Sequence, residues 1–157
     1  MRVYIRNKLI SLRGSSYVLN ENEEPIFNVK GKLISPTKKK FIYDMEGNLL
    51  YIVRNQYWSG FTNAAFVYDG NKNKLAKIKK KFWSGKLIVE GYKDEITMPH
   101  GSGNIMRNGE PMGKVIRDIS LITDRFTVEA DEKDIPFCVA MVIAKDNIRD
   151  KDRKDRI

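Results

Sequence analysis

The sequence is poor in the residues that build disulfide frameworks and metal centres. Its 157 residues include one cysteine, Cys138, and one histidine, His100. A single cysteine excludes an intramolecular disulfide and a zinc site made of several thiolates, and it indicates a reducing compartment such as the cytoplasm. No apolar run approaches the roughly 20 residues that a helix needs to cross a bilayer. The alternating apolar and polar residues of segment 1–14 also lack the apolar core of a signal peptide. We therefore predict a cytoplasmic protein without a transmembrane segment.

Positive charge is in excess. The chain has 29 lysines and arginines against 20 aspartates and glutamates, a net charge of +9. Such a surplus favours polyanions, which include nucleic acid, phospholipid head groups and acidic proteins, but it does not choose among them. The hydrophobic content of 41% is typical of a folded globular domain.

The two tryptophans belong to an internal repeat. When the chain is shifted by 25 residues, segment 41–60 aligns with segment 66–85, and eight of the 20 positions are identical. Each copy has β-prone residues, an Asp-x-x-x-Asn turn, a second β-prone stretch and the sequence Trp-Ser-Gly. The repeat predicts two equivalent β-hairpins. We interpret Trp58 and Trp83 as packing residues at equivalent strand ends, on a barrel rim.

Further hairpins flank this pair. Segment 17–32 has a polar turn between two short strands, and segment 104–120 has Asn108-Gly109, a strong hairpin signal, at its turn. Other strands are expected in 2–11, 85–92 and 121–130. The sequence therefore predicts a meandering β protein with about ten or more strands, which is long enough to close into a barrel.

The C-terminal part has a different pattern. Asp134 is a candidate N-cap and Pro136 would lie in the first turn of a helix over 134–148. Residues 135–144 are all apolar, so this helix would be buried on every side. A buried strand would also fit the local pattern. Residues 150–157 alternate basic and acidic side chains and are predicted to form a solvated tail.

Four segments, 27–32, 43–53, 68–78 and 134–148, resemble the LURP-one-related family in their order and spacing. This family shares its fold with the tubby C-terminal domain and the phospholipid scramblases. The resemblance implies a mainly β fold, a closed antiparallel barrel of about twelve strands that encloses a central hydrophobic C-terminal helix. It covers residues 1–149 as a single domain. Cys138 would then be an inert buried thiol.

Candidate catalytic and metal-binding groups are few. His100 and Ser102 lie two residues apart on a glycine-rich loop, which does not preorganise a nucleophile and its base. Apolar neighbours would raise the pKa of Cys138. The acidic residues at 131, 132 and 134 lack the spacing of a calcium loop and are explained by the positive end of the helix dipole. We predict no enzymatic activity, no cofactor and no metal.

Lysines supply the strongest functional signal. On a strand, Lys77, Lys79 and Lys81 would share one face, while Lys80 would lie on the other. Lys38, Lys39 and Lys40 form a second cluster. One hypothesis is that these six lysines bind anionic ligands, because each lysine near an anionic membrane surface contributes about 1 kcal/mol. The alternative is a solvated outer face that also blocks edge-to-edge aggregation.

Three functions remain open from sequence. The first is a binding module for phosphoinositides or acidic membrane surfaces, since the resemblance extends to tubby domains, which bind phosphoinositides, and to scramblases, which act on lipids. Scrambling itself is not expected, because the Pro-rich segment and cysteine clusters of scramblases are absent. The second is single-stranded nucleic-acid binding through Tyr57, Trp58, Phe82 and Trp83. The third is a scaffold for protein partners.

Overall fold

The computed structural model describes residues 1–6, 15–32, 37–57, 63–80, 87–119 and 124–154. The first strands are β1 (Arg2–Arg6), β2 (Ser15–Asn20), β3 (Pro25–Gly31), β4 (Lys40–Asp44), β5 (Leu49–Asn55) and β6 (Asn63–Asp69). The later elements are β7 (Lys74–Lys80), β8 (Leu87–Gly91), β9 (Ile96–Thr97), β10 (Gly103–Arg107), β11 (Glu110–Ile119), β12 (Asp124–Ala130) and the helix α2 (Ile135–Lys154).

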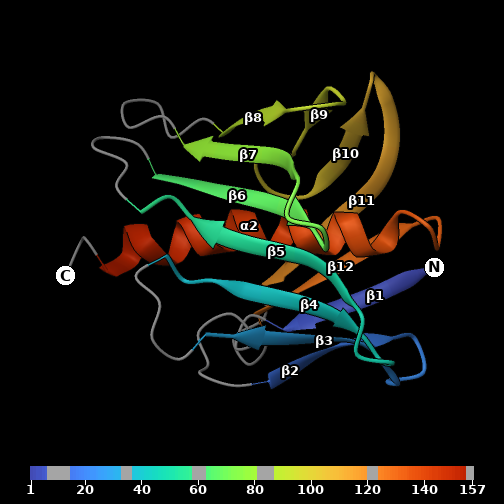
Figure 1. The fold of residues 1–157 in the computed structure, drawn as a ribbon. Helices are drawn as coiled ribbons and strands as arrows, with labels where there is room; N and C mark the ends of the chain where they lie inside the picture. The colour runs from blue at the N-terminus through green and yellow to red at the C-terminus, as the bar shows by residue number, and fades with distance from the viewer. Residues whose placement is uncertain (7–14, 33–36, 58–62, 81–86, 120–123, 155–157) are drawn as a thin grey trace.

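The strands form one antiparallel sheet that curls around α2 (Figure 1). Sequence neighbours pair from β1 to β8 and from β9 to β12, and β1 pairs with β12 to join the two runs. The end strands of this order, β8 and β9, follow each other in the chain, so the sheet is a nearly closed barrel. The expected mainly β barrel of twelve antiparallel strands around a C-terminal helix is confirmed.

Alternation of side chains along each strand divides the sheet into an inner and an outer face. On β1, Val3 and Ile5 are fully buried, and on β7 the same holds for Ala76 and Ile78. These residues pack with the helix in one hydrophobic core. The other face of each strand is turned outward and carries polar residues together with a small apolar cluster of Ile52, Phe66 and Tyr68.

The helix fills the barrel. It begins directly after Asp134, whose backbone carbonyl accepts a hydrogen bond from the amide of Cys138 at 3.0 Å. Ile135 and residues 137–144 are at most 5% exposed, as a helix without a polar face requires. The apolar segment is therefore a helix and not a buried strand, and it continues to Lys154, beyond the expected end near residue 148. In the described chain, no helix is both long and apolar enough to cross a bilayer.

The two hairpins of the repeat have the same turn. The Oδ1 atom of Asp44 accepts hydrogen bonds from the amides of Glu46 and Asn48, at 3.0 and 2.8 Å. The Nδ2 atom of Asn48 donates to Oδ2 of the same carboxylate. Asp69 accepts the same three bonds, from the amides of Asn71 and Asn73 and from Nδ2 of Asn73. The identical Asp and Asn of the repeat are thus explained by turn chemistry.

A third copy of this turn lies between β2 and β3. Oδ1 of Asn20 accepts from the same two amide positions, and its Nδ2 atom donates to the carboxylate of Glu24. In all three turns the fourth residue has a positive φ, at 63° for Glu23, 91° for Gly47 and 67° for Lys72. Only the second turn has the glycine that this conformation favours.

The predicted Asn-Gly turn is also present. Asn108 and Gly109 have φ values of 52° and 82° between β10 and β11, as expected for a two-residue hairpin loop. Trp58 and Trp83 lie outside the described residues, so their interpretation as rim residues stays a prediction.

Candidate functional site

The basic strand β7 turns two of its lysines outward. Ala76 and Ile78 are fully buried in the barrel, so Lys77 and Lys79 lie on the opposite face, as the alternation predicts. The carboxylate of Glu90 on β8 pairs with the ammonium of Lys79. The hydrogen bond from that ammonium lowers the pKa of Glu90. Lys81 lies outside the described residues.

Aromatic rings lie beside these lysines on β6. Phe66 is the register partner of Lys77, and the Nζ atoms of Lys77 and Lys74 lie 5.1 and 4.9 Å from the centre of its ring. Phe66 packs with Tyr68 and Ile52 in a small apolar cluster that is separate from the barrel core. Ammonium groups are attracted to the face of an aromatic ring at this distance, so the cluster fixes cations above an apolar floor.

Arg54 on β5 is the best-held cation of this surface. Its guanidinium lies 5.2 Å from the ring centre of Phe66 and 5.3 Å from that of Tyr68. The hydroxyl of Tyr68 accepts hydrogen bonds from its Nε and Nη2 atoms at 3.0 and 2.6 Å. Two rings and a hydroxyl therefore position one planar cation, a group suited to bidentate binding of phosphate oxygens.

A hollow of about 210 Å³ lies next to this arginine. Its lining includes Ile52 and Tyr68 as an apolar wall, with Lys39, Arg54 and Lys72 as cations. Lys72 comes from the turn after β6, where its backbone is left-handed. Three cations from three separate parts of the chain thus surround one hollow on the outside of the barrel.

The predicted lysine cluster 38–40 is divided between the two sides of the sheet. Lys39 points outward, with its Nζ atom 5.5 Å from the ring centre of Phe41. Lys40 is only 5% exposed, and its Nζ atom donates to Oδ1 of Asn147 on the helix at 2.6 Å. The carbonyl of Lys38 accepts from Nδ2 of the same Asn147 at 3.2 Å. The structure therefore brings Lys39 to the hollow but places Lys40 inside the barrel.

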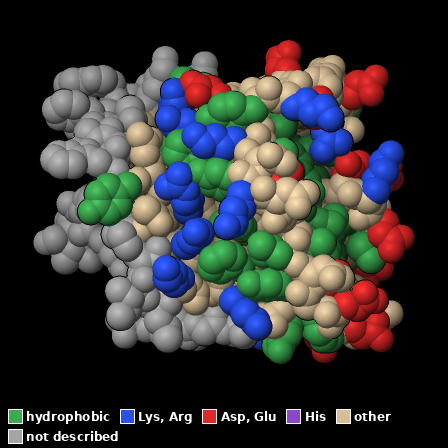
Figure 2. All heavy atoms as spheres, viewed as in Figure 1, with side chains coloured by type: hydrophobic (Ala, Val, Ile, Leu, Met, Phe, Trp, Pro, Cys, Tyr) green, Lys and Arg blue, Asp and Glu red, His purple; other side chains and the backbone are tan. Residues whose placement is uncertain are grey.

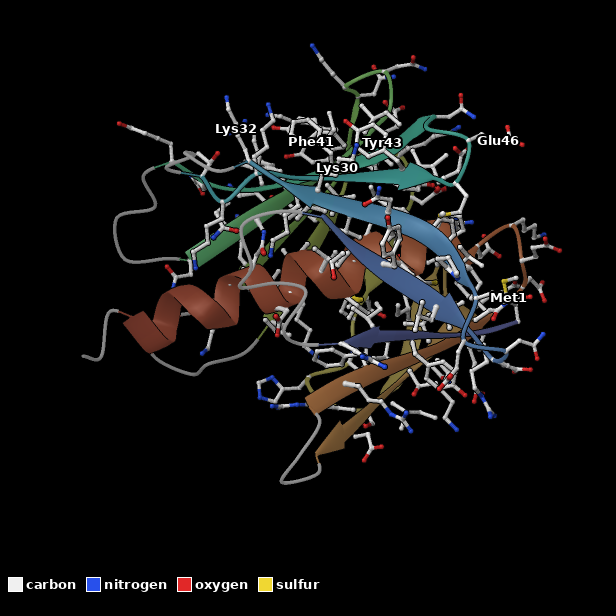
Figure 3. The ribbon with its side chains drawn as sticks, turned by 90° about the horizontal axis from the view of Figure 1, so that it is seen from below. Met1, Lys30, Lys32, Phe41, Tyr43 and Glu46 are labelled. Atoms are coloured by element: carbon white, nitrogen blue, oxygen red, sulfur yellow. The ribbon has the colours of Figure 1, made fainter. Side chains whose placement is uncertain are left out.

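The outer surface continues onto β3 and β4. Lys30 is the register partner of Phe41, and its Nζ atom lies 5.3 Å from the ring centre of Tyr43. Figure 3 shows Lys30, Phe41 and Tyr43 together on the outer side of the sheet, away from the helix.

We define the basic face as the outward side chains of these strands and turns. Its cations are Lys30, Lys39, Arg54, Lys72, Lys74, Lys77 and Lys79, and its apolar floor is Phe41, Tyr43, Ile52, Phe66 and Tyr68. In Figure 2 lysines and arginines cross this surface with hydrophobic side chains between them, and most of the carboxylates lie towards its right side. The face is therefore an extended positive surface with an aromatic base.

Arg54 was not among the sequence-predicted residues. The repeat contains the signal that would have found it, because a shift of 25 residues aligns Arg54 with Lys79 and Ile52 with Lys77. Its stacking on Phe66 requires the register of β5 against β6, which the sequence alone does not specify.

The candidate catalytic and metal-binding residues take part in packing and in local hydrogen bonds. Cys138 is fully buried in the core, and burial raises the pKa of its thiol to about 12. The hydroxyl of Ser102 accepts a hydrogen bond from the amide of Arg117 at 3.0 Å. Asp134 accepts from Nη1 of Arg107 at 3.2 Å. Within the described ranges, no three histidine, cysteine or acidic side chains come together as metal ligands would.

Comparison with known proteins supplies a family and a fold. A family model described as LURP-one-related matches residues 1–146. A crystal structure of a protein from Arabidopsis thaliana superposes with a TM-score of 0.59 and 14% identity, covering 94% of this chain and 91% of that chain. This likeness concerns the fold. No curated protein matches the chain.

Proposed function

Because the chain belongs to the LURP-one-related family, we propose that it is a non-enzymatic β-barrel binding module whose basic face docks on anionic phospholipid head groups at the cytoplasmic surface of a membrane. The observation that carries this proposal is the set of cations held over aromatic rings on the outside of β3 to β7. The hollow beside Arg54 has the size and charge to receive a phosphate-bearing head group.

Several properties of this face favour an anionic surface as its partner. Each lysine or arginine close to an anionic leaflet contributes about 1 kcal/mol, and several such cations lie on one side of the molecule. The ammonium groups of Lys30, Lys74 and Lys77 lie over the rings of Tyr43 and Phe66, and this attraction holds positive charge on the outside of the barrel. Arg54 is held in place by Tyr68, so little side-chain entropy is lost when it binds a phosphate.

Single-stranded nucleic acid is a less suitable partner for the described rings. Base stacking requires an open ring face. Phe66 and Tyr68 are 8% and 9% exposed, and the guanidinium of Arg54 lies against both. These rings therefore support cations. Tyr57 is 72% exposed, whereas Trp58 and the aromatic residues 82 and 83 lie outside the described part of the chain.

Liposome binding with matched charge variants tests the proposal. The variant Arg54→Gln/Lys77→Gln removes two cations of the basic face. The control Lys114→Gln/Lys133→Gln removes two exposed cations from β11 and from the turn before the helix. At about 1 kcal/mol each, losing two face cations should weaken partitioning onto phosphatidylserine vesicles about 30-fold. The control variant should bind almost as the unaltered protein does.

Lipid composition and salt separate a specific face from general attraction. Binding should be absent on vesicles of phosphatidylcholine alone and should weaken as salt rises. Equal losses for both variants would mean that net charge and not the basic face drives binding. A single-stranded oligonucleotide that binds as tightly as the vesicles, and with the same salt dependence, would contradict recognition of head groups.

A further inference from the structure

Tyr57 is the most exposed large hydrophobic residue in the described part of the chain, with 72% of its surface open to solvent. The next in exposure is Tyr92, at 52%. Tyr57 lies two residues after the end of β5 and three residues after Arg54 of the basic face. Three extended residues span at most about 11 Å. Tyr57 therefore borders the basic face.

The strand end that carries Tyr57 is fixed by three hydrogen bonds. The amide of Asn55 donates to the carbonyl of Thr37 at 2.7 Å, and the amide of Gln56 donates to a carbonyl of β6 at 2.9 Å. Asn55 is only 4% exposed, and its Nδ2 atom donates to the backbone carbonyl of Asn147 on the helix at 3.3 Å. These bonds tie the end of β5 to the segment before β4, to β6 and to α2. The exposed ring therefore follows an anchored strand end.

The acidic residues of this part of the barrel lie at the other ends of the strands. Segment 25–89 contains three carboxylates, those of Asp44, Glu46 and Asp69. All three belong to the turns that join β4 to β5 and β6 to β7. Because β5 begins after the first of these turns and ends two residues before Tyr57, the carboxylates and the exposed ring are at opposite ends of the sheet (Figure 1).

Cations lie at the end of the sheet where β5 finishes. Lys30 and Lys32 lie at the end of β3, and Lys79 lies at the end of β7, on the same side of the barrel as the end of β5 (Figure 1). Figure 3 shows Lys32 and Glu46 at opposite ends of the sheet. The charge along β3 to β7 therefore changes from negative at the turns to positive at the strand ends near Tyr57.

This charge gradient gives the molecule a preferred orientation at an anionic surface. A negative leaflet attracts nearby lysines and arginines and repels carboxylates. The end that carries Tyr57 would therefore approach the surface first. Tyrosine suits this position, because its ring is apolar and its hydroxyl is polar, and such side chains settle at the level of the lipid head groups.

From these observations we propose that Tyr57 is an interfacial anchor whose ring enters the head-group layer while the neighbouring cations bind lipid phosphates. This inference rests on the proposed docking of the basic face and adds the orientation of the docked molecule. The strand ends beside Tyr57 face the membrane, and turns 44–48 and 69–73 face away from it.

Spin labelling tests the orientation. Cys138 is fully buried, and burial raises the pKa of its thiol to about 12, so a thiol reagent should label an introduced cysteine selectively. Tyr57→Cys and Tyr92→Cys each receive a nitroxide label. Tyr92 is the matched control, because it is also exposed but donates its amide to the carbonyl of Leu75, near the acidic turns. On phosphatidylserine vesicles the label at 57 should lose collisions with a water-soluble nickel chelate, whereas the label at 92 should keep them.

Vesicle partitioning measures what the ring contributes. Tyr57→Ala should weaken binding to phosphatidylserine vesicles about tenfold, because part of one aromatic ring is no longer removed from water. The salt dependence of binding should stay the same, since no charge is lost. Tyr57→Phe and Tyr92→Ala should both bind almost as the unaltered protein does.

The results separate this inference from the docking on which it rests. If the unaltered protein does not bind phosphatidylserine vesicles, both fail. If it binds while the label at 57 keeps its collisions with the chelate, or while Tyr57→Ala binds normally, the docking stands and the orientation is wrong. A loss of oligonucleotide binding by Tyr57→Ala, without a loss on vesicles, would identify the ring as a base-stacking surface and would also overturn the inference.

Discussion

Replacing Gly113 with alanine tests how closely the helix fills the barrel. A Cβ atom on Gly113 would lie 2.7 Å from Sγ of Cys138 on the helix and 3.3 Å from Cβ of Ala130 on β12. Non-bonded heavy atoms prefer separations of about 3.5–4.0 Å. The alanine would therefore force β11 and the helix apart or displace the cysteine side chain, in a core where Cys138 is fully buried.

The expected cost follows from this geometry. Adding a methyl group to a close-packed core costs about 1–3 kcal/mol. For a domain of this length, about 2 kcal/mol lowers the melting temperature by about 4–8 °C. Cys138→Ala should cost about 1 kcal/mol, because it removes one well-packed atom. Cys138→Ala also removes the closest contact of the new methyl group. The loss in free energy of unfolding of the double variant should therefore be about 1–2 kcal/mol smaller than the sum of the losses of the two single variants.

Urea unfolding of the unaltered protein, the two single variants and the double variant, followed by far-ultraviolet circular dichroism, measures this coupling. Gly109→Ala is not a suitable reference, because its φ is positive, whereas Gly101 has open space around its Cβ position and serves as the control. Gly101→Ala should have little effect. Additive costs for Gly113→Ala and Cys138→Ala would refute the close approach of the helix to β11.

Two further predictions concern the repeated turns. The asparagine four residues on lowers the pKa of both Asp44 and Asp69 through a side-chain hydrogen bond, so their contribution to stability is present at neutral pH and is lost as pH falls through the lowered values. Asp44→Asn/Asp69→Asn should therefore flatten the loss of stability in acid urea titrations, and an unchanged pH dependence would contradict this. Lys72→Gly should raise the free energy of unfolding by up to about 1 kcal/mol, because it relieves a left-handed residue, whereas Gly47→Ala should lower that free energy by about 1 kcal/mol; urea unfolding measures both changes. The opposite signs would argue against a shared turn conformation.

Local patterns in the sequence were sufficient to predict the hairpins and the burial of the apolar C-terminal segment, although they left a buried strand open beside the helix. Asp44 and Asp69 occupy identical places in the repeat, and each forms its turn from atoms within five residues. The unbroken apolar stretch 135–144 required burial on every side, which the closing sheet supplies. Such features depend on near neighbours only, so no knowledge of strand pairing was needed.

Features that depend on pairing between hairpins could not be predicted. Arg54 lies over Phe66 because β5 and β6 pair in a register that places them opposite each other. Lys40 follows two other lysines, and a run of like residues has no alternation from which to assign a face. It is turned inward because it begins β4 at the parity of the buried Ile42.

The division of the lysines has a consequence for the meaning of net charge in this chain. Lys79 and Lys80 are adjacent and chemically identical, yet Lys79 pairs with Glu90 on the outside, whereas Lys80 has the parity of the buried residues Ala76 and Ile78. Successive side chains of a strand point to opposite faces of the sheet, so two neighbouring lysines on one strand are separated by the sheet itself. Alternate lysines of this basic segment therefore lie on opposite sides of the sheet. Substitution of the whole run would therefore alter both sides of the sheet at once, and only single changes at alternate positions can test the proposed docking of the outer face without disturbing the inner one.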